Sequence, residues 1–137
     1  MQNESPVNKP IDVLILAAGL GTRMRSGIAK VLHRLGETPL INHVCRTAAA
    51  LGPDKIYVVV GHQADEVKKA VLEEIEADRV EFVTQKEQLG TGDAVNAARE
   101  HFTDRDSTLL ILSGDVPLIR HETLASLVQY HHNHRGR

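Results

Sequence analysis

The sequence predicts an α/β fold with a mostly parallel sheet of about four strands flanked by helices. Four short apolar runs, at residues 11–16, 56–60, 80–84 and 109–112, are continuous in the way typical of strands that are covered on both faces. Amphipathic stretches separate these runs, and strand–helix alternation with short connections favours a parallel sheet. The length of 137 residues suits a single domain.

The connections between the expected strands carry helical patterns. Residues 39–51 begin with Pro39, which suits a first helical turn, and stop before Gly52. A second helix is expected over residues 64–77, a third opens at Thr91 or Gly92, and a fourth runs from about residue 120 to 130. Their expected core residues are Val67, Ala70, Val71 and Ile75 in the second helix, Ala94, Val95, Ala98 and Phe102 in the third, and Leu124, Leu127 and Val128 in the fourth.

The ends of the chain are expected to lie outside this core. Residues 1–10 are polar, contain two prolines and are expected to be a flexible segment, which leaves residues 11–137 as the folded unit. Three histidines, at positions 131, 132 and 134, are expected at a solvated helix end, without chemistry.

Composition excludes several classes of partner. A net charge of −2 gives no general attraction to nucleic acid or to an anionic membrane. Aromatic residues make up only 3% of the chain and Trp is absent, which argues against base stacking on single strands. The single cysteine, Cys45, forms no internal disulfide and is expected to be a packed thiol. The sequence shows neither a signal-peptide pattern nor an apolar run long enough to span a membrane, so we expect a cytoplasmic protein.

The most informative motif follows the first expected strand. It reads Leu16-Ala-Ala-Gly-Leu-Gly-Thr-Arg-Met-Arg25, with Lys30 a few residues later. Small residues let a backbone approach an anion closely, with its amides pointing at the anion. Arg23 and Lys30 add the fixed positive charge that phosphate binding requires. The motif indicates a nucleotide site; the alternative is a tight turn with a solvated Arg23.

Spacing excludes two common phosphate motifs. The dinucleotide-binding fingerprint needs a third glycine, but Met24 stands at that position. The P-loop needs Lys and Ser or Thr after its second glycine, but Ile28 follows Gly27.

Three polar or glycine-rich segments converge on one edge of the predicted sheet. They are residues 16–30, 85–92 and 113–117, and each follows a strand at the edge where such sheets bind ligands. Asp115 is the candidate ligand for Mg²⁺, or else an ordinary turn aspartate. Gln85 both donates and accepts, which can match a pyrimidine edge, and Thr91 at a helix start can donate to a ligand. Their alternative is an ordinary loop and helix cap.

Four segments together resemble the sugar-nucleotide pyrophosphorylases. They are residues 16–25, Ala-Lys-Val-Leu-His at 29–33, Glu-Gln-Leu-Gly-Thr-Gly at 87–92 and Gly-Asp-Val-Pro-Leu at 114–118. The last two narrow the resemblance to the uridyltransferase domain of the bifunctional N-acetylglucosamine-1-phosphate uridyltransferases/glucosamine-1-phosphate acetyltransferases of bacterial cell-wall synthesis. The similarity spans roughly residues 11–130. It implies a Rossmann-like nucleotidyltransferase core, of which this chain is a truncated, N-terminal portion.

The resemblance also implies roles for individual residues. It places Arg23 and Lys30 on the phosphates as the catalytic residues and makes Asp115 the Mg²⁺ ligand. The nucleotide-binding residues that it implies are Leu16, Ala17, Ala18, Gly19, Gly21 and Lys30 after the first strand, Gln85, Gly90 and Thr91 at the base, and Ser113, Gly114 and Asp115 at the ribose and metal.

The implied reaction transfers UMP from UTP to N-acetylglucosamine 1-phosphate, which gives UDP-N-acetylglucosamine and pyrophosphate for peptidoglycan and lipopolysaccharide precursors. In the family, the sugar pocket and a second metal ligand come from later in the domain, and full-length members are trimers through a β-helix that is absent here. The alternatives are another nucleotidyltransferase, of the molybdenum-cofactor guanylyltransferase or isoprenoid cytidylyltransferase type, and a nucleotide-binding fragment without catalysis.

Three positions depart from the family pattern. Ala29 stands where proline usually precedes the lysine, so the loop that holds Lys30 is expected to be less rigid. Ser113 replaces a tyrosine, and Asp93 replaces a histidine and adds negative charge near the site.

Overall fold

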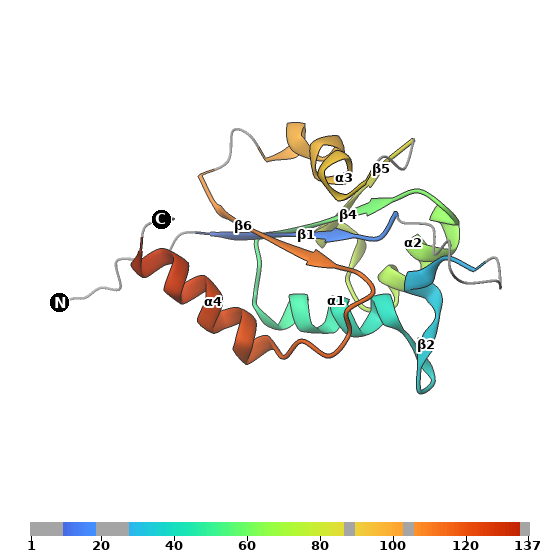
Figure 1. The fold of residues 1–137 in the computed structure, drawn as a ribbon, viewed down its shortest axis with the longest axis horizontal. Coiled ribbons are helices and arrows are strands. Elements are labelled where there is room, and N and C mark those ends of the chain that lie inside the picture. The colour runs from blue at the N-terminus through green and yellow to red at the C-terminus, as the bar shows by residue number, and fades with distance from the viewer. Residues whose placement is uncertain (1–9, 19–27, 87–89, 103–105, 135–137) are drawn as a thin grey trace.

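The computed structural model describes residues 10–18, 28–86, 90–102 and 106–134. At its centre lies a four-stranded parallel sheet in the order β5-β4-β1-β6 (Figure 1). This confirms the predicted α/β fold class. The strands are β1 (Ile11–Leu16), β4 (Lys55–Val60), β5 (Val80–Thr84) and β6 (Thr108–Ser113), and the helices are α1 (Leu40–Ala50), α2 (Ala64–Leu72), α3 (Thr91–Ala97) and α4 (His121–Asn133). Three short 3-10 helices, η1 (Lys30–Leu32), η2 (Ala77–Arg79) and η3 (Arg99–His101), and a small hairpin of β2 (Arg34–Leu35) and β3 (Thr38–Pro39) complete the fold.

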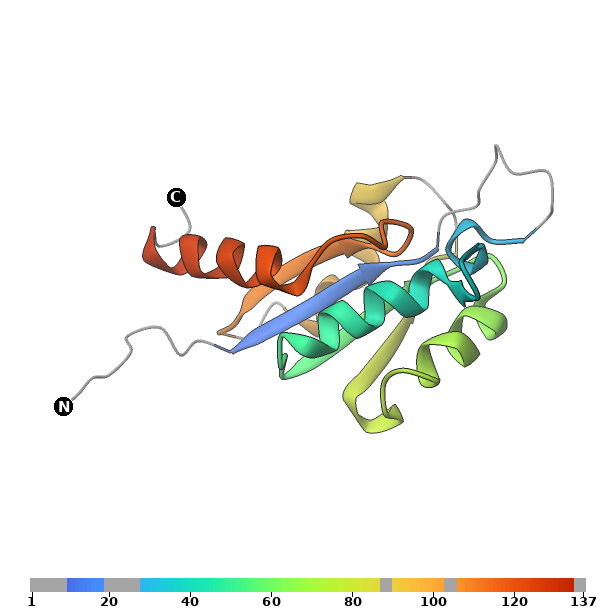
Figure 2. The same cartoon turned by 90° about the horizontal axis from the view of Figure 1, so that it is seen from below.

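Helices lie on both faces of the sheet, which suits strands that are mostly apolar; Asp12 in β1 and Glu81 in β5 are exceptions. Figure 2 shows α1, α2 and α4 side by side on one face, and Figure 1 shows α3 on the other. Val13 and Ile15 of β1 are fully buried in the larger core on the α1 face, whereas Leu14 between them is fully buried against the α3 face. The alternation of side chains along a strand produces this division.

The strand order reverses beside β1. The chain runs from β1 outward to β4 and β5, then crosses over to β6, which pairs with the other side of β1. In open α/β sheets, ligands bind at such a switch point, outside the carboxyl ends of the strands. The topology alone therefore directs attention to the residues that follow Leu16 and Ser113.

Helix α2 is shorter than predicted. It ends at Leu72 instead of residue 77, although all four of its expected core residues are buried. The N–H groups of Glu73 and Glu74 bond to carbonyls three residues back, so the last turn tightens. The Glu74 carboxylate accepts bonds from Asn42 and Arg46 of α1, which holds this turn against the neighbouring helix.

Helix α4 is longer than predicted, and its C-terminal histidines are not all solvated. It continues to Asn133 because His132 is buried, with its Nε2 atom 2.7 Å from the Thr108 hydroxyl on β6. The expectation of a wholly solvated histidine cluster is therefore wrong for His132. The expectation for Leu127 is also wrong, since that side chain is 54% exposed while Leu124 and Val128 are buried.

The predicted division into a flexible segment, residues 1–10, and a folded unit, residues 11–137, stays a prediction. Residues 1–9 lie outside the described residues, and the Pro10 carbonyl already accepts the Thr108 N–H group. Across the described ranges, none of the helices combines the length and the apolar character that a membrane span requires.

Candidate nucleotide site

The first residues beyond three strands are held at one edge of the sheet by backbone hydrogen bonds. These bonds continue the ladders of the sheet past the last strand residues, so the described residues that open the three predicted segments lie at the same edge. The N–H of Ala17 donates to the Val59 carbonyl (2.9 Å), that of Gly114 to Leu16 (2.9 Å) and that of Gln85 to Val60 (2.8 Å).

Lys30 and Asp115 form an ion pair at this edge. The Lys30 Nζ atom, at the start of η1, lies 3.1 Å from Asp115 Oδ2, just after β6. The Ser113 hydroxyl donates to the other oxygen of the same carboxylate, at 2.5 Å. Two predicted site residues from opposite ends of the sequence are thereby in contact, although the sequence predicted only their proximity and not the pair itself.

The Asp115 carboxylate is ionised at neutral pH. Its burial opposes ionisation, but the bonds from Ser113 and Lys30 outweigh that effect and hold its pKa below the ordinary value. Both partners remain accessible, because half of the Lys30 side chain and 24% of the Asp115 side chain are exposed. Because both groups are accessible, each can exchange its contact within the ion pair for a contact with a charged ligand.

Gly114 permits the close approach of three segments. A Cβ atom at this position would lie 3.0 Å from the Leu16 carbonyl oxygen, 3.0 Å from Val31 and 3.1 Å from Ile41. A side chain here would therefore crowd the end of β1, η1 and α1, which would have to shift by a few tenths of an ångström. Gly114 thus lets the residue before Asp115 pack closely against the end of β1.

The Gln85 side chain is buried and bound to Asp93. Its Nε2 group donates to Asp93 Oδ2 at 2.8 Å, which fixes the amide beside the N-terminus of α3. From the sequence, Asp93 was expected only to add negative charge near the site. Its carboxylate in fact orients Gln85, a predicted base-contacting residue. Gly90 precedes the helix at φ +107°, a value that favours glycine, and the exposed Thr91 begins α3 as predicted.

The predicted residues after β1 are only partly described. Ala17 and Ala18 are buried in the two cores, so their side chains pack inward. Gly19, Gly21 and Arg23 lie outside the described residues, and their predicted roles stay predictions.

A fourth segment reaches the same edge and was missed in the sequence. Residues 61–63 follow β4, and the Gln63 side chain accepts a hydrogen bond from the Ala29 backbone N–H, directly before Lys30. The signal was available, because Gly61-His-Gln63 ends an apolar run in the same way as the three segments that were recognised.

Asp115 is the carboxylate that the sequence predicts as a metal ligand, and that role stays a prediction. Within the part of the chain that the structure describes, no three His, Cys, Asp or Glu side chains gather to hold a metal by themselves. A metal at this edge would therefore need ligands from elsewhere, such as water or phosphate oxygens.

A parallel sheet with a Lys–Asp pair beyond its switch point defines an α/β domain whose carboxyl edge can take a charged ligand. The comparison with known families is more specific: the MobA-like NTP transferase domain matches residues 13–137. The chain belongs to this family.

Individual relatives agree with this assignment. The chain is 43% identical over 126 residues to the bifunctional protein GlmU of Rippkaea orientalis, and 49% identical over 118 residues to that of Cellvibrio japonicus. These matches cover 92% and 86% of this chain but only 27% and 25% of the relatives, in their N-terminal part. The chain therefore spans about a quarter of the length of the curated relatives that it matches.

Solved structures share the fold. An Rv0371c homologue from Mycobacterium sp. strain JC1 superimposes with a TM-score of 0.71 at 29% identity, covering 88% of this chain and 59% of that one. Rv0371c of Mycobacterium tuberculosis, solved as a complex with manganese, gives 0.68 at 20% identity, with coverage of 90% and 60%.

Proposed function

We propose that this chain is the nucleotide-binding part of a UTP-dependent sugar-1-phosphate nucleotidyltransferase. In this proposal UMP passes from UTP to N-acetylglucosamine 1-phosphate, which yields UDP-N-acetylglucosamine and pyrophosphate. The observation that carries the proposal is the accessible Lys30–Asp115 pair at the switch point of the sheet. The identity to the GlmU proteins supports the choice of base and sugar.

The reaction needs no nucleophile from the protein. A phosphate oxygen of the sugar phosphate forms a bond to the α-phosphorus of UTP, and the bond from that phosphorus to the bridging oxygen of pyrophosphate breaks. The protein contributes by positioning the reactants and by stabilising negative charge. Lys30 holds the phosphates, and Arg23 is assigned to the charge that grows on the α-phosphoryl group.

The residues at this edge fit a divalent cation, for which we propose Mg²⁺. Mg²⁺ takes one or two carboxylates and completes its shell with water and substrate phosphates, so a lone ionised Asp115 suits it. The bound cation would neutralise phosphate charge. The manganese in Rv0371c, a relative in fold, is in keeping with a divalent metal.

The remaining contacts follow the resemblance. Gln85, Gly90 and Thr91 are assigned to the base, and residues 16–19 to the base and ribose. Gly21 is assigned to the nucleotide as a further binding residue. Ser113 and Gly114 are assigned to the ribose beside Asp115. The orientation of the Gln85 amide by Asp93 supports its part in this assignment, because a fixed amide discriminates donors from acceptors.

Titration calorimetry of the chain with UTP, CTP and GTP, each with and without Mg²⁺, tests the proposal. We expect the tightest binding for UTP, with a dependence on Mg²⁺ that is lost in Asp115→Asn. Asp78→Asn, which changes an exposed carboxylate on η2, is the control. Preferred binding of GTP or CTP would favour the guanylyltransferase or cytidylyltransferase alternative instead.

A second measurement separates binding from turnover. Pyrophosphate release by the chain, supplied with UTP and N-acetylglucosamine 1-phosphate, distinguishes a complete enzyme from a nucleotide-binding portion. We propose the latter: the chain is the nucleotide-binding portion of an enzyme that acts in the cytoplasm and whose product supplies cell-wall precursors. Robust release of pyrophosphate would contradict the proposal that the chain only binds nucleotide and would favour a complete catalytic unit.

A further inference from the structure

Gln63 has an unusual backbone conformation. Among the described residues it is the only one other than glycine with a positive φ, at φ +54° and ψ +44°. Side chains disfavour this left-handed region, where glycine and asparagine are the usual residues. A glutamine in such a position indicates that its side chain has a use that outweighs the backbone cost.

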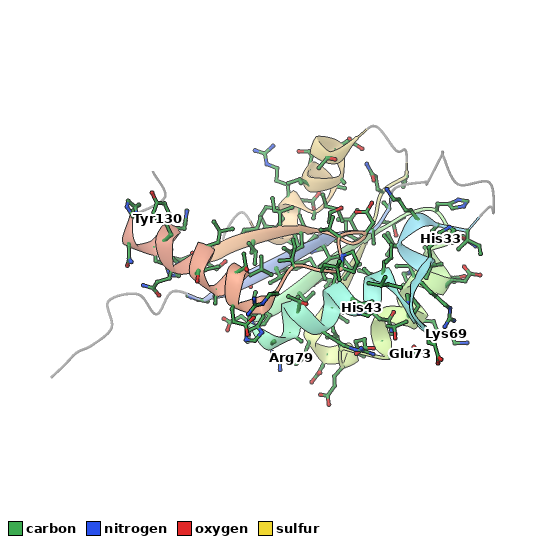
Figure 3. All side chains as sticks on the ribbon, turned by 60° about the horizontal axis from the view of Figure 1, so that its bottom comes forward. His33, His43, Lys69, Glu73, Arg79 and Tyr130 are labelled. Atoms are coloured by element: carbon green, nitrogen blue, oxygen red, sulfur yellow. The ribbon has the colours of Figure 1, made fainter. Side chains whose placement is uncertain are left out.

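The side chain of Gln63 is bonded to the segment that carries Lys30. Its Oε1 atom accepts the backbone N–H of the fully buried Ala29. The Gln63 carbonyl in turn accepts the N–H of Val67 at 3.0 Å, which anchors the residue to the first turn of α2. Figure 3 shows His33, which follows η1, and Lys69 of α2 on the same side of the molecule, in agreement with the packing of these two elements.

This bond acts one residue away from the ion pair. Ala29 has φ −53° and ψ +140°, the extended conformation that proline adopts without help. Alanine has no ring to fix this conformation, but it retains the N–H group that proline lacks. The Ala29 carbonyl then accepts the Leu32 N–H at 2.9 Å and so begins η1, whose first residue is Lys30.

We propose that Gln63 is a positioning residue for Lys30. Its hydrogen bond to Ala29 holds the start of η1 in the place where the Lys30 ammonium group faces Asp115 and, on the proposed function, the phosphates of UTP. The pair Gln63–Ala29 takes over the role that a proline at position 29 would perform through its ring. From the sequence, Ala29 was expected to make this loop less rigid. In this proposal the hydrogen bond from Gln63, in the loop after β4, compensates for that loss of rigidity.

Five variants of the 137-residue chain test this inference by calorimetry with Mg²⁺–UTP, by amide hydrogen exchange at Leu32 and by thermal unfolding. Gln63→Leu removes the acceptor, and we expect affinity to fall about two- to tenfold, as for loss of one hydrogen bond, with faster exchange at Leu32. Gln63→Glu keeps an acceptor and should stay near the parent. Ala29→Pro in the Gln63→Leu background should restore both affinity and exchange.

Gln63→Gly separates positioning from stability. It relieves the left-handed strain, so its melting temperature should not fall, while its affinity falls as in Gln63→Leu. The control is Gln129→Leu, which removes an exposed glutamine of α4 that bonds only to Asn133 of its own helix in the described contacts. This variant should leave affinity and Leu32 exchange unchanged.

Parent-like affinity and Leu32 exchange in Gln63→Leu would overturn the inference, as would failure of Ala29→Pro to restore the double variant. If the parent chain does not bind Mg²⁺–UTP, the proposed function fails. Leu32 exchange then decides the positioning role by itself: faster exchange in Gln63→Leu that Ala29→Pro reverses supports it, and any other result overturns it.

Discussion

Gly114 shows how one absent side chain determines the geometry of the site. Residues of β1, η1 and α1 lie so close to Gly114 that a Cβ atom at this position would touch all three elements. The same glycine places Asp115 one residue beyond the last ladder bond, which Gly114 itself donates to Leu16. The residue before the carboxylate thus packs closely against one backbone carbonyl, of Leu16, and against the side chains of Val31 and Ile41.

Gly114→Ala should destabilise the protein by about 1–3 kcal/mol, because the added methyl group overpacks a contact with rigid backbone. Urea unfolding measures the change. Gly92→Ala is the matched control, since a Cβ there meets no atom within 4 Å and alanine favours the helix. Equal losses of stability in the two variants would contradict this account of Gly114.

Cys45 should be chemically inert in the folded protein. Burial, with a smaller contribution from the negative charge of Glu74, raises the pKa of its thiol to about 12. The thiolate is the reactive form, so almost none exists at pH 8. A thiol reagent at that pH is expected to label Cys45 only at the rate of unfolding, and fast labelling in native buffer would be the opposite result.

Among the elements, α1 and the end of α2 are joined by a carboxylate. Arg46 donates two bonds to Glu74, at 2.9 and 3.0 Å, and Asn42 donates a third at 3.1 Å. The hydrogen bond from Arg46 is the largest cause of the lowered pKa of Glu74, and the bond from Asn42 and the nearby charges of Arg46 and His43 add to it against the effect of burial. The cluster fixes the turn at which α2 ends.

Glu74→Gln should therefore be less stable than the parent at neutral pH, with a difference that shrinks in acid. A carboxylate whose pKa is lowered by folding stabilises the native state above its unfolded pKa of about 4.3, and this stability is lost as the pH falls through the lower folded value. Urea unfolding at a series of pH values from neutral to below 4 measures it. A difference that is constant with pH would show that the charge of Glu74 has no part in it.

The strands were predictable because their signal is local, whereas several element ends were not. Short, mostly apolar runs located β1, β4, β5 and β6 nearly to the residue. The ends of α2 and α4 depend on bonds from Glu74 and His132 to residues far away in the sequence, which no local pattern contains. The β2–β3 hairpin has only two residues in each strand, too few for alternation to show.

At the scale of the whole molecule, the topology determined how much of the site was predictable. Parallel strands place their carboxyl ends together, so Lys30, Gln85 and Asp115 were correctly assigned to one edge. Which of them pair was not predictable, because pairing depends on side-chain distances of a few ångströms. Asp93 was expected only to add charge, and its bond to Gln85 is visible only in three dimensions.

The proposed ligand should stabilise the whole fold. Lys30 and Asp115 belong to segments that pack on α1, β1 and β6, so a ligand held by both joins the switch point to the core on its larger face. Mg²⁺–UTP at a hundred times its dissociation constant is expected to add about 2.7 kcal/mol to the free energy of unfolding, because it binds only the native state. Thermal or urea unfolding with UTP, with Mg²⁺ and with both measures this linkage. Asp115→Asn should abolish the part that requires Mg²⁺, and Lys30→Met should weaken the effect of the nucleotide. Stabilisation of the same size in both variants would mean that the ligand binds elsewhere on the molecule.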